Sequence, residues 1–324
     1  MRTRLPLQIA VLGNAQDPYI ASLRSDDYAT FHVVSPSELQ ASKDRLQTVE
    51  AALLWEIPPS SLAELFALCP ALKWAHAKSA GVENLPLSLF REHNITLTNA
   101  AGVFAESLAE FVVAGLLYFL KDIPLLRRQQ QTRSWKPYEV LELRGSTALI
   151  VGYGGIGRAI AERLAALKVN VIACRNRTEL QDPFVTKTIA PASIAAHLPT
   201  VDHLILSAPL TSETRGMIGP REVAALKESS IVVNVGRGPL IDEAALLNAL
   251  RTNQILGAAL DVFDEEPLPE RHPFWDLENV LISPHTADRT AGWLWDALAG
   301  FQGLLERRVS GLPLTNIVDI DRGY

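Results

Sequence analysis

The sequence predicts an α/β protein with two doubly wound parallel-sheet domains. Short apolar runs alternate with segments of helical periodicity along most of the 324 residues, which is the rhythm of βαβ units. The chain is also longer than a single hydrophobic core usually extends, which favours two domains. A glycine-rich turn at residues 152–157 joins an apolar run to a helical segment near the middle of the chain.

The first hundred residues contain five short apolar runs typical of buried strands. Between them lie segments with helical spacing, such as Ser61–Leu68 with Ser60 or Ser61 as its N-cap. The runs are Gln8–Leu12, Thr30–Val34, Ala51–Trp55, Leu72–Ala77 and Ile95–Thr98. This region is therefore expected to form a small parallel α/β domain without a nucleotide fingerprint of its own.

A loop of small residues follows the fourth of these runs, at residues 78–82. It lies at the carboxyl end of a strand, where open parallel sheets bind ligands. Ala80, Gly81 and Val82 would expose backbone N–H groups to a substrate carboxylate. An ordinary strand-to-helix turn explains the same residues equally well.

A long apolar helix is predicted over Ala105–Lys121, with apolar residues on nearly all sides. Such a helix suits an interdomain or subunit contact. The polar and aromatic segment Leu125–Leu143, which includes Trp135, is interpreted as an arm or loop. Together they predict a homodimer, and the alternative is a surface loop on a monomer.

The glycine turn has the context of a dinucleotide-binding fingerprint: the strand Thr147–Val151, the turn, a helix over Arg158–Lys168, and a second strand. In this pattern Gly152 permits the tight turn, Gly154 lets the backbone approach a pyrophosphate, and Gly157 lets the helix pack on the strand. The helix N-terminus also favours an anion. We therefore expect a dinucleotide site here.

The end of the second strand, Val169–Cys174, indicates which dinucleotide binds. NAD sites commonly place an acid there, whereas this chain continues Arg175, Asn176, Arg177. An arginine fork suits a 2′-phosphate. The sequence thus predicts NADP(H) in preference to NAD(H), with NAD(H) still possible, and a solvated basic loop is the alternative.

Three candidate catalytic residues come directly after predicted strands in the second half of the chain. Arg237, Glu266 and His285 would share one crevice, because the carboxyl ends of parallel strands converge. These residues follow the predicted strands Ile231–Val235, Leu256–Val262 and Val280–Ser283, and a fourth strand of this half, His203–Ser207, ends at residues 208–211. A closing helix, Gly292–Arg308, then returns to the first domain, so the chain crosses between domains near residues 99–103 and 286–292.

These three side chains together suit acid–base chemistry on a keto acid. Glu266 could fix the tautomer of His285, which would supply a proton, and Arg237 could hold a carboxylate and polarise a carbonyl. Taken singly, the arginine could be a solvated loop residue, the histidine structural and the glutamate part of an acidic turn. The remaining histidines lack such neighbours and are assigned no chemistry: His32, His76, His93, His197, His203 and His272.

Five ordered motifs make the chain resemble the D-isomer-specific 2-hydroxyacid dehydrogenase family over nearly its full length. They are Gly152–Gly157, Pro209-Leu210-Thr211 with Glu213-Thr214, Asn234–Gly238, Leu260–Phe263 with Glu266-Pro267, and Ser283–Thr286. The resemblance implies reversible reduction of a 2-keto acid to the D-2-hydroxy acid. Arg237 would bind the substrate, His285 would donate the proton, and Glu266 would be its partner.

The resemblance also implies a Rossmann dinucleotide-binding domain, residues 102–287, inserted in a flavodoxin-like substrate domain formed by residues 1–101 and 288–324. The implied substrate-binding residues are Ala80, Gly81, Val82, Arg237 and His285. The implied cofactor-binding residues are Gly152, Gly154, Gly155, Ile156, Gly157, Arg175, Asn176, Arg177, Ala208, Pro209, Thr214, Val235, Gly236, Arg237, Asp261 and His285. Asp261 would lie near the nicotinamide carboxamide.

Two departures from the family pattern bear on the expected cofactor and substrate. Family members that use NAD carry Asp where this chain has Arg175, and Glu83 stands where Asp is more usual. The arginine, the segment Ala52–Trp55 followed by Pro58-Pro59, and the final Asp321–Tyr324 are similar to NADPH-dependent glyoxylate/hydroxypyruvate reductases. Glyoxylate or hydroxypyruvate is therefore the first expected substrate, and a bulkier 2-keto acid stays open.

Composition argues against several other classes of protein. The net charge of −6 gives no basic surface for nucleic acid, and the longest apolar stretch is too short to cross a membrane. Two cysteines without metal-ligand spacing, and no visible secretory leader, fit a cytoplasmic protein without a metal site. The rival interpretations are a non-catalytic NAD(P)H sensor like the family's corepressor relatives, and a formate-type or alanine-dehydrogenase-like enzyme.

Overall fold

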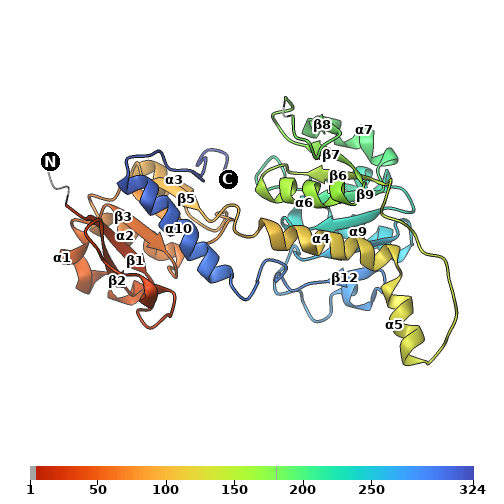
Figure 1. Cartoon of the computed structure of the whole chain (residues 1–324), viewed down its shortest axis with the longest axis horizontal. Helices are drawn as coiled ribbons and strands as arrows, with labels where there is room; N and C mark the ends of the chain where they lie inside the picture. The colour runs from red at the N-terminus through yellow and green to blue at the C-terminus, as the bar shows by residue number, and fades with distance from the viewer. Residues whose placement is uncertain (1–4, 180) are drawn as a thin grey trace. The chain divides into compact units, whose positions relative to one another are not determined.

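The computed structural model describes residues 5–179 and 181–324. The chain divides into two compact units (Figure 1): unit 1 combines Met1–Val103 with Ala291–Tyr324, and unit 2 is Phe104–Thr290. Each unit has one parallel sheet with helices packed against it. The predicted fold class is confirmed.

Unit 1 has a five-stranded parallel sheet in the order β2-β1-β3-β4-β5. The order reverses direction at β1, which is the flavodoxin-like arrangement. The strands are β1 (Leu7–Leu12), β2 (Ala29–Val34), β3 (Ala51–Leu54), β4 (Trp74–Ala77) and β5 (Thr96–Asn99), and the helices are α1 (Lys43–Leu46), α2 (Leu62–Leu68), α3 (Leu87–Glu92) and α10 (Trp293–Val309). All five predicted strands of this region are present, with ends shifted by one or two residues.

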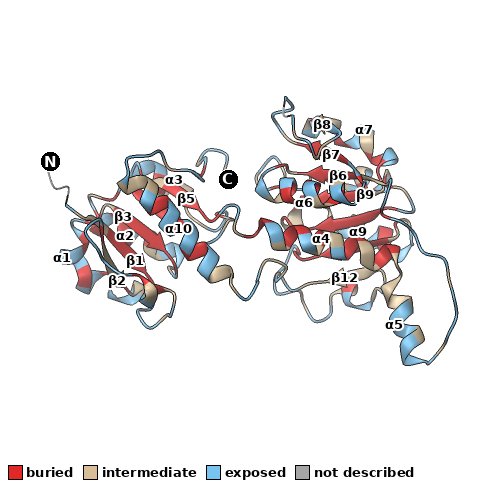
Figure 2. Cartoon of the chain, viewed as in Figure 1, coloured by how far each residue is buried: buried red, intermediate tan, exposed pale blue. Residues whose placement is uncertain are grey.

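The central strands of the unit 1 sheet are buried, as the red segments in Figure 2 show, whereas most residues of the edge strand β2 are half-buried. One face carries a cluster of apolar side chains that includes Trp55, Trp74 and Phe301. The rings of Trp74 on β4 and Phe301 on α10 stack with centroids 5.5 Å apart. The last helix therefore covers the sheet built by the first hundred residues, so residues from both ends of the chain form one core.

Unit 2 has a seven-stranded parallel sheet in the order β12-β11-β10-β9-β6-β7-β8. The reversal lies between β6 and β9, which is the Rossmann order with one additional strand. The strands are β6 (Thr147–Val151), β7 (Asn170–Cys174), β8 (Lys187–Ile189), β9 (His203–Leu206), β10 (Ile231–Asn234), β11 (Gly257–Leu260) and β12 (Val280–Ile282). The helices are α4 (Ala105–Leu120), α5 (Ile123–Gln131), α6 (Gly155–Ala166), α7 (Ile194–His197), α8 (Pro220–Ala224) and α9 (Glu243–Arg251).

Two elements of unit 2 differ from the sequence-based expectation. The segment Leu125–Leu143 was expected to be an arm or loop, but its first part belongs to helix α5. The Asp122 carboxylate accepts a hydrogen bond from the Leu125 N–H at 3.1 Å, and Pro124 lies in the first turn, so the helix has both start signals. Strand β8 was not predicted, because only Ile189 of its three residues is buried and so short a run gives no periodicity.

Helix α4 packs along α6 and against β10 and β11 (Figure 1). A side chain at Gly115 would place its Cβ 2.7 Å from the Ala259 Cβ, so glycine permits the close approach of helix and sheet. Phe111, Val113 and Leu117 of α4 are only half-buried, and Glu106, Glu110 and Ala114 are exposed, whereas the sequence predicted burial nearly all round. In the described residues, no helix is both long and apolar enough to cross a membrane.

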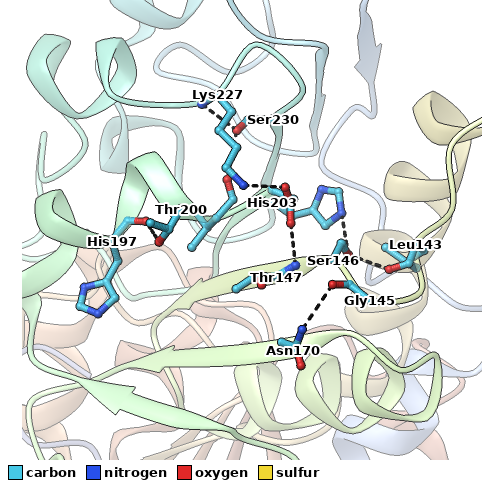
Figure 3. A network of polar contacts seen from close by, with 12 residues as sticks. Leu143, Gly145, Ser146, Thr147, Asn170, His197, Thr200, His203, Lys227 and Ser230 are labelled. Carbon is cyan, nitrogen blue, oxygen red and sulfur yellow. Dashed lines mark hydrogen bonds and ion pairs between the residues drawn. The ribbon is translucent and has the colours of Figure 1, made fainter.

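A polar network ties the amino ends of the unit 2 strands together (Figure 3). Asp202 accepts hydrogen bonds from the Thr147 N–H and the Lys227 Nζ, each at 2.8 Å. His203 is buried, and its Nε2 lies 3.2 Å from the Ser146 Oγ. Burial lowers the pKa of His203 to about 4. This network lies at the end of the sheet opposite the glycine turn and stabilises the fold there.

Candidate active site

The glycine turn follows β6 directly and needs glycine at two positions. Gly152 has φ +95°, and a Cβ there would lie 2.5 Å from the Ala208 backbone nitrogen. A Cβ at Gly157 would lie 2.2 Å from the Gly152 carbonyl oxygen. Both contacts are with backbone, which cannot move aside, so the turn and the start of α6 can take this shape only with glycine at these positions.

The space in front of helix α6 suits a pyrophosphate. A Cβ at Gly154 would meet nothing within 4 Å, and this N-cap residue provides no side-chain hydrogen bond to the helix. No acidic residue lies in the first turn of this 12-residue helix. An open approach to uncapped N–H groups at a helix N-terminus is what a dinucleotide phosphate requires. The residues present therefore fit the cofactor that the sequence predicts.

The two predicted phosphate-binding arginines lie at the same edge of the sheet as the glycine turn. Strands β6 and β7 are paired in parallel, with Val151 opposite Cys174, so both strands end together. The Arg175 N–H is bonded to the Ile189 carbonyl of β8 at 3.0 Å, which fixes its backbone. Asn176 and Arg177 are exposed, so their side chains are accessible to a ligand.

Arg158, near the glycine turn, makes two contacts that were not predicted from the sequence. The Arg158 Nε bonds the Asp182 carboxylate at 3.0 Å, and its guanidinium lies 5.1 Å from the Phe184 ring centroid. This contact attaches the segment after β7 to the start of α6. Burial, reinforced by the Asp182 charge, raises the pKa of Tyr153 to about 12, so the phenol keeps its proton.

The turns after β9 and β10 approach each other closely. The Thr214 hydroxyl donates to the Pro209 carbonyl at 2.6 Å, which closes the turn after β9. A Cβ at Gly236 would lie 2.9 Å from the Ala208 carbonyl oxygen. The predicted cofactor-binding residues of these two turns are therefore neighbours, although they are far apart in sequence.

Arg237 projects from a turn that the buried Asn234 side chain organises. The Asn234 amide accepts from the Gly236 N–H at 3.1 Å and donates to the Arg237 carbonyl at 2.9 Å. The Arg237 guanidinium donates to the Gly236 carbonyl at 2.6 Å, and the residue is partly exposed. The asparagine in the matched motif thus has a physical role: it holds the backbone that carries the arginine.

Glu266 and His285 form the predicted carboxylate–imidazole pair. The Glu266 Oε2 and the His285 Nδ1 are 2.7 Å apart. Because a carboxylate only accepts, Nδ1 carries the proton and Nε2 is the nitrogen left for a ligand. The other oxygen of Glu266 accepts from the Phe263 N–H at 3.0 Å. Both side chains remain about one-third exposed, at 34% and 37%, so the pair is fixed yet accessible.

Asp261 anchors the segment that carries His285. One of its carboxylate oxygens accepts from the Ser283 hydroxyl at 2.5 Å and from the Thr286 and Ala287 N–H groups at 3.0 Å. His285 itself has φ +52°, a strained conformation that persists only where surrounding bonds impose it. Burial raises the pKa of Asp261 although these hydrogen bonds oppose the shift. The sequence did not predict this anchoring.

In unit 1 the predicted substrate loop follows β4. Two carbonyl groups of the loop accept hydrogen bonds. The Asn99 amide donates to the Ala80 carbonyl at 2.6 Å, and the Ser79 hydroxyl donates to the Gly81 carbonyl at 2.8 Å. Among the described residues, no acceptor is paired with the N–H groups of Ala80, Gly81 and Val82. The loop can therefore offer consecutive donors to an anion.

Comparison with known proteins decides the family. The family model "D-isomer specific 2-hydroxyacid dehydrogenase, NAD binding domain" matches residues 113–287, more than half of the chain. The chain belongs to this family. Its NAD-binding domain falls within unit 2, which contains the glycine turn, Arg237, Glu266 and His285.

Individual members of the family differ in their recorded activities. A glyoxylate/hydroxypyruvate reductase A of Yersinia enterocolitica is 31% identical over 287 residues, which cover 86% of this chain and 88% of that protein. A D-3-phosphoglycerate dehydrogenase of Archaeoglobus fulgidus is 33% identical over 267 residues. The match covers 80% of this chain but 49% of the phosphoglycerate dehydrogenase, so this chain spans about half the length of that relative.

A solved structure of a family member matches nearly the whole chain. The NADPH-dependent glyoxylate/hydroxypyruvate reductase from Sinorhizobium meliloti, in complex with NADP and sulfate, superposes with a TM-score of 0.82 at 26% identity. The superposition covers 98% of this chain and all of that one. The family resemblance in the sequence is thereby confirmed at the level of the fold.

Proposed function

We propose that this protein reduces a small 2-keto acid, glyoxylate or hydroxypyruvate first, to the D-2-hydroxy acid with NADPH. The observation that carries the proposal is the Glu266–His285 pair, bonded at 2.7 Å and accessible, in the unit that also carries the glycine turn. Relatives named glyoxylate reductase and glyoxylate/hydroxypyruvate reductase support the substrate class. The bound nicotinamide would supply the hydride.

His285 would supply the proton. With Nδ1 bonded to Glu266, Nε2 is the nitrogen from which a proton can pass to the substrate carbonyl oxygen. The Glu266 carboxylate orients the ring and stabilises its positive charge before the transfer. In the reverse direction the same nitrogen accepts the proton of the hydroxyl group, so one pair serves both directions.

Arg237 would bind the substrate carboxylate, and the loop at Ala80–Val82 is retained as a candidate substrate-binding segment of unit 1. A guanidinium is always charged and matches a carboxylate with two parallel bonds. It would also stabilise negative charge that develops on the neighbouring carbonyl oxygen. The free N–H groups of the loop offer further donors. On this proposal unit 1 is the substrate domain and unit 2 the dinucleotide-binding domain.

The cofactor preference would depend on Arg175 and Arg177. Two guanidinium groups in place of an acid favour a 2′-phosphate over the free ribose hydroxyls. The Sinorhizobium reductase crystallised with NADP, which supports the preference. We also propose a homodimer through α4 and the arm, because Trp135 of the arm is 96% exposed, and a cytoplasmic location.

The test is the loss of NADPH absorbance with a panel of 2-keto acids. Wild-type protein should turn over glyoxylate or hydroxypyruvate, with a higher kcat/KM for NADPH than for NADH. His285→Ala should lower kcat by about 10²–10⁴-fold, while the Kd for NADPH, measured by fluorescence, changes little. No turnover of any 2-keto acid by wild-type protein would contradict the proposal and favour a sensor. Normal kcat in the variant would contradict the role of His285.

A further inference from the structure

A second carboxylate–imidazole pair lies in unit 2, outside the residues assigned above. His272 precedes a short turn of 3-10 helix, and Glu243 is the first residue of α9. The His272 Nε2 and the Glu243 Oε1 are 3.0 Å apart. Their side chains are 16% and 24% exposed, so both are largely withdrawn from water. No pattern in the sequence predicted a contact between these two residues, which are 29 positions apart.

The hydrogen bonds of His272 fix its orientation. Its Nδ1 accepts from the Phe274 N–H at 3.3 Å, so the proton is on Nε2 and is donated to Glu243. The imidazole also packs against the Phe274 ring, with centroids 4.8 Å apart. A ring held on both nitrogens and on one face cannot swing freely, and it therefore holds the Glu243 carboxylate in place.

The second oxygen of Glu243 reaches the segment that carries Glu266. It accepts from the Asp264 N–H at 3.3 Å, while the preceding amide, of Phe263, donates to Glu266. Two consecutive amides thus bind two different carboxylates. The same backbone is packed against Gly238, where a Cβ would lie 2.0 Å from the Phe263 carbonyl carbon. The turn that carries Arg237 and the Glu243 carboxylate thus both contact the segment, and together they form a clamp on it.

The clamp also has an unfavourable electrostatic component. Burial raises the pKa of Asp264, and the neighbouring charge of Glu243 raises it further, while Arg215 and His272 act in the opposite direction. Carboxylates held near one another destabilise the folded chain. Glu243 therefore lies close enough to act on the Asp264 side chain as well as on its backbone N–H.

We infer that Glu243 and His272 are positioning residues for proton transfer: they hold the Phe263–Asp264 backbone, and through it align the Glu266 carboxylate with His285. The inference rests on the proposed function, in which that pair handles the proton. It adds two residues that contact neither substrate nor cofactor in the proposed mechanism. Their effect would be on the rate of the chemical step, not on binding.

The experiment compares Glu243→Ala, Glu243→Gln, His272→Ala and His272→Gln. Glu243→Ala removes the acceptor of the Asp264 amide and should lower kcat about 10–100-fold, as expected when a catalytic group is displaced by about 1 Å. The KM for the keto acid and the Kd for NADPH should change little. His272→Ala should lower kcat less. His272→Gln should recover most of it, because its amide can still donate to Glu243, whereas Glu243→Gln keeps one acceptor oxygen and should be intermediate.

Amide hydrogen exchange provides a readout that does not depend on turnover. In Glu243→Ala, a peptide spanning residues 258–270 should exchange faster than in wild-type protein. The control is His197→Ala, which removes a histidine bonded to Lys187 and Ser193 and should alter neither exchange in this peptide nor kcat. Unchanged exchange, or unchanged kcat in an active enzyme, would overturn the inference. If wild-type protein reduces no 2-keto acid, the proposed function fails and the exchange result alone decides whether Glu243 holds the segment.

Discussion

The buried His203 should make the stability of unit 2 depend strongly on pH. The residue is 1% exposed, and among the described residues its Nδ1 has no hydrogen-bond partner. Figure 3 shows the ring beside Ser146 at the amino end of β9. Burial lowers its pKa from 6.5 to about 4, because a charged imidazole would lose its hydration. Protonation is therefore easier in the unfolded chain.

The direction and the size of the change in stability with pH follow from this pKa shift. Between pH 6.5 and about 4 the unfolded chain binds the proton and the folded chain does not, so stability is lost as the pH falls through this window. From pH 7 to pH 5 the linkage relation gives a loss of about 2 kcal/mol from His203 alone. Below the folded pKa the loss approaches a limit of about 3 kcal/mol.

The assay is urea unfolding of wild-type protein and His203→Gln at pH 7 and pH 5, followed by circular dichroism. The glutamine variant starts from its own stability at pH 7, so the quantity compared is the change between the two pH values. Wild-type protein should lose about 2 kcal/mol more than the variant. His197→Gln, which changes a histidine bonded to Lys187, should retain the wild-type pH dependence. Equal pH dependence of His203→Gln and wild-type protein would refute the reasoning.

Three further predictions concern the turn, the cofactor and the assembly. Gly157→Ala forces a Cβ to within 2.2 Å of the Gly152 carbonyl oxygen and should destabilise the protein by about 1–3 kcal/mol and weaken NADPH binding. The control Gly303→Ala, which meets nothing within 4 Å in α10, should stabilise by about 0.5–1 kcal/mol in thermal melts. Arg175→Ala should lower kcat/KM for NADPH about 10–100-fold, because hydrogen bonds to charged groups contribute about 1.5–3 kcal/mol. The kcat/KM for NADH should not change. Equal losses of kcat/KM with both cofactors would count against a contact between Arg175 and the 2′-phosphate. Trp135→Glu should shift sedimentation equilibrium towards the monomer, and a monomeric wild-type protein would contradict the proposed homodimer.

Short-range signals in the sequence determined the fold class and most of the elements. Largely apolar runs of four to seven residues predicted the buried strands, and eleven of the twelve strands of the described chain were found this way. The exception, β8, is held mainly by pairing with β7 and shows one buried side chain. Helix α5 was missed for a different reason: Asp122 and Pro124 are local start signals, but the helix that follows has no buried face.

The glycine turn was also predicted from the sequence, by the spacing of its glycines. Gly157 meets the nearby Gly152 carbonyl, whereas the space at Gly152 is limited by Ala208, which follows β9 and is distant in the sequence. The candidate pair of Glu266 and His285 was predicted because both follow strands of one parallel sheet. In a parallel sheet the carboxyl ends of the strands lie along one edge, so a residue that follows a strand in the sequence can be placed at that edge.

Only the tertiary structure decided how those side chains are held. Asp261 binds the His285 segment, and Glu243 binds the Glu266 segment and is itself held by His272. These hydrogen bonds join residues 21 to 29 positions apart. No periodic pattern in the sequence predicts such pairs. Each hydrogen bond depends on strand register and loop conformation, and both are set by packing of the whole core. The amino acids specify which elements form and where they end, whereas packing of the complete chain specifies which polar groups meet.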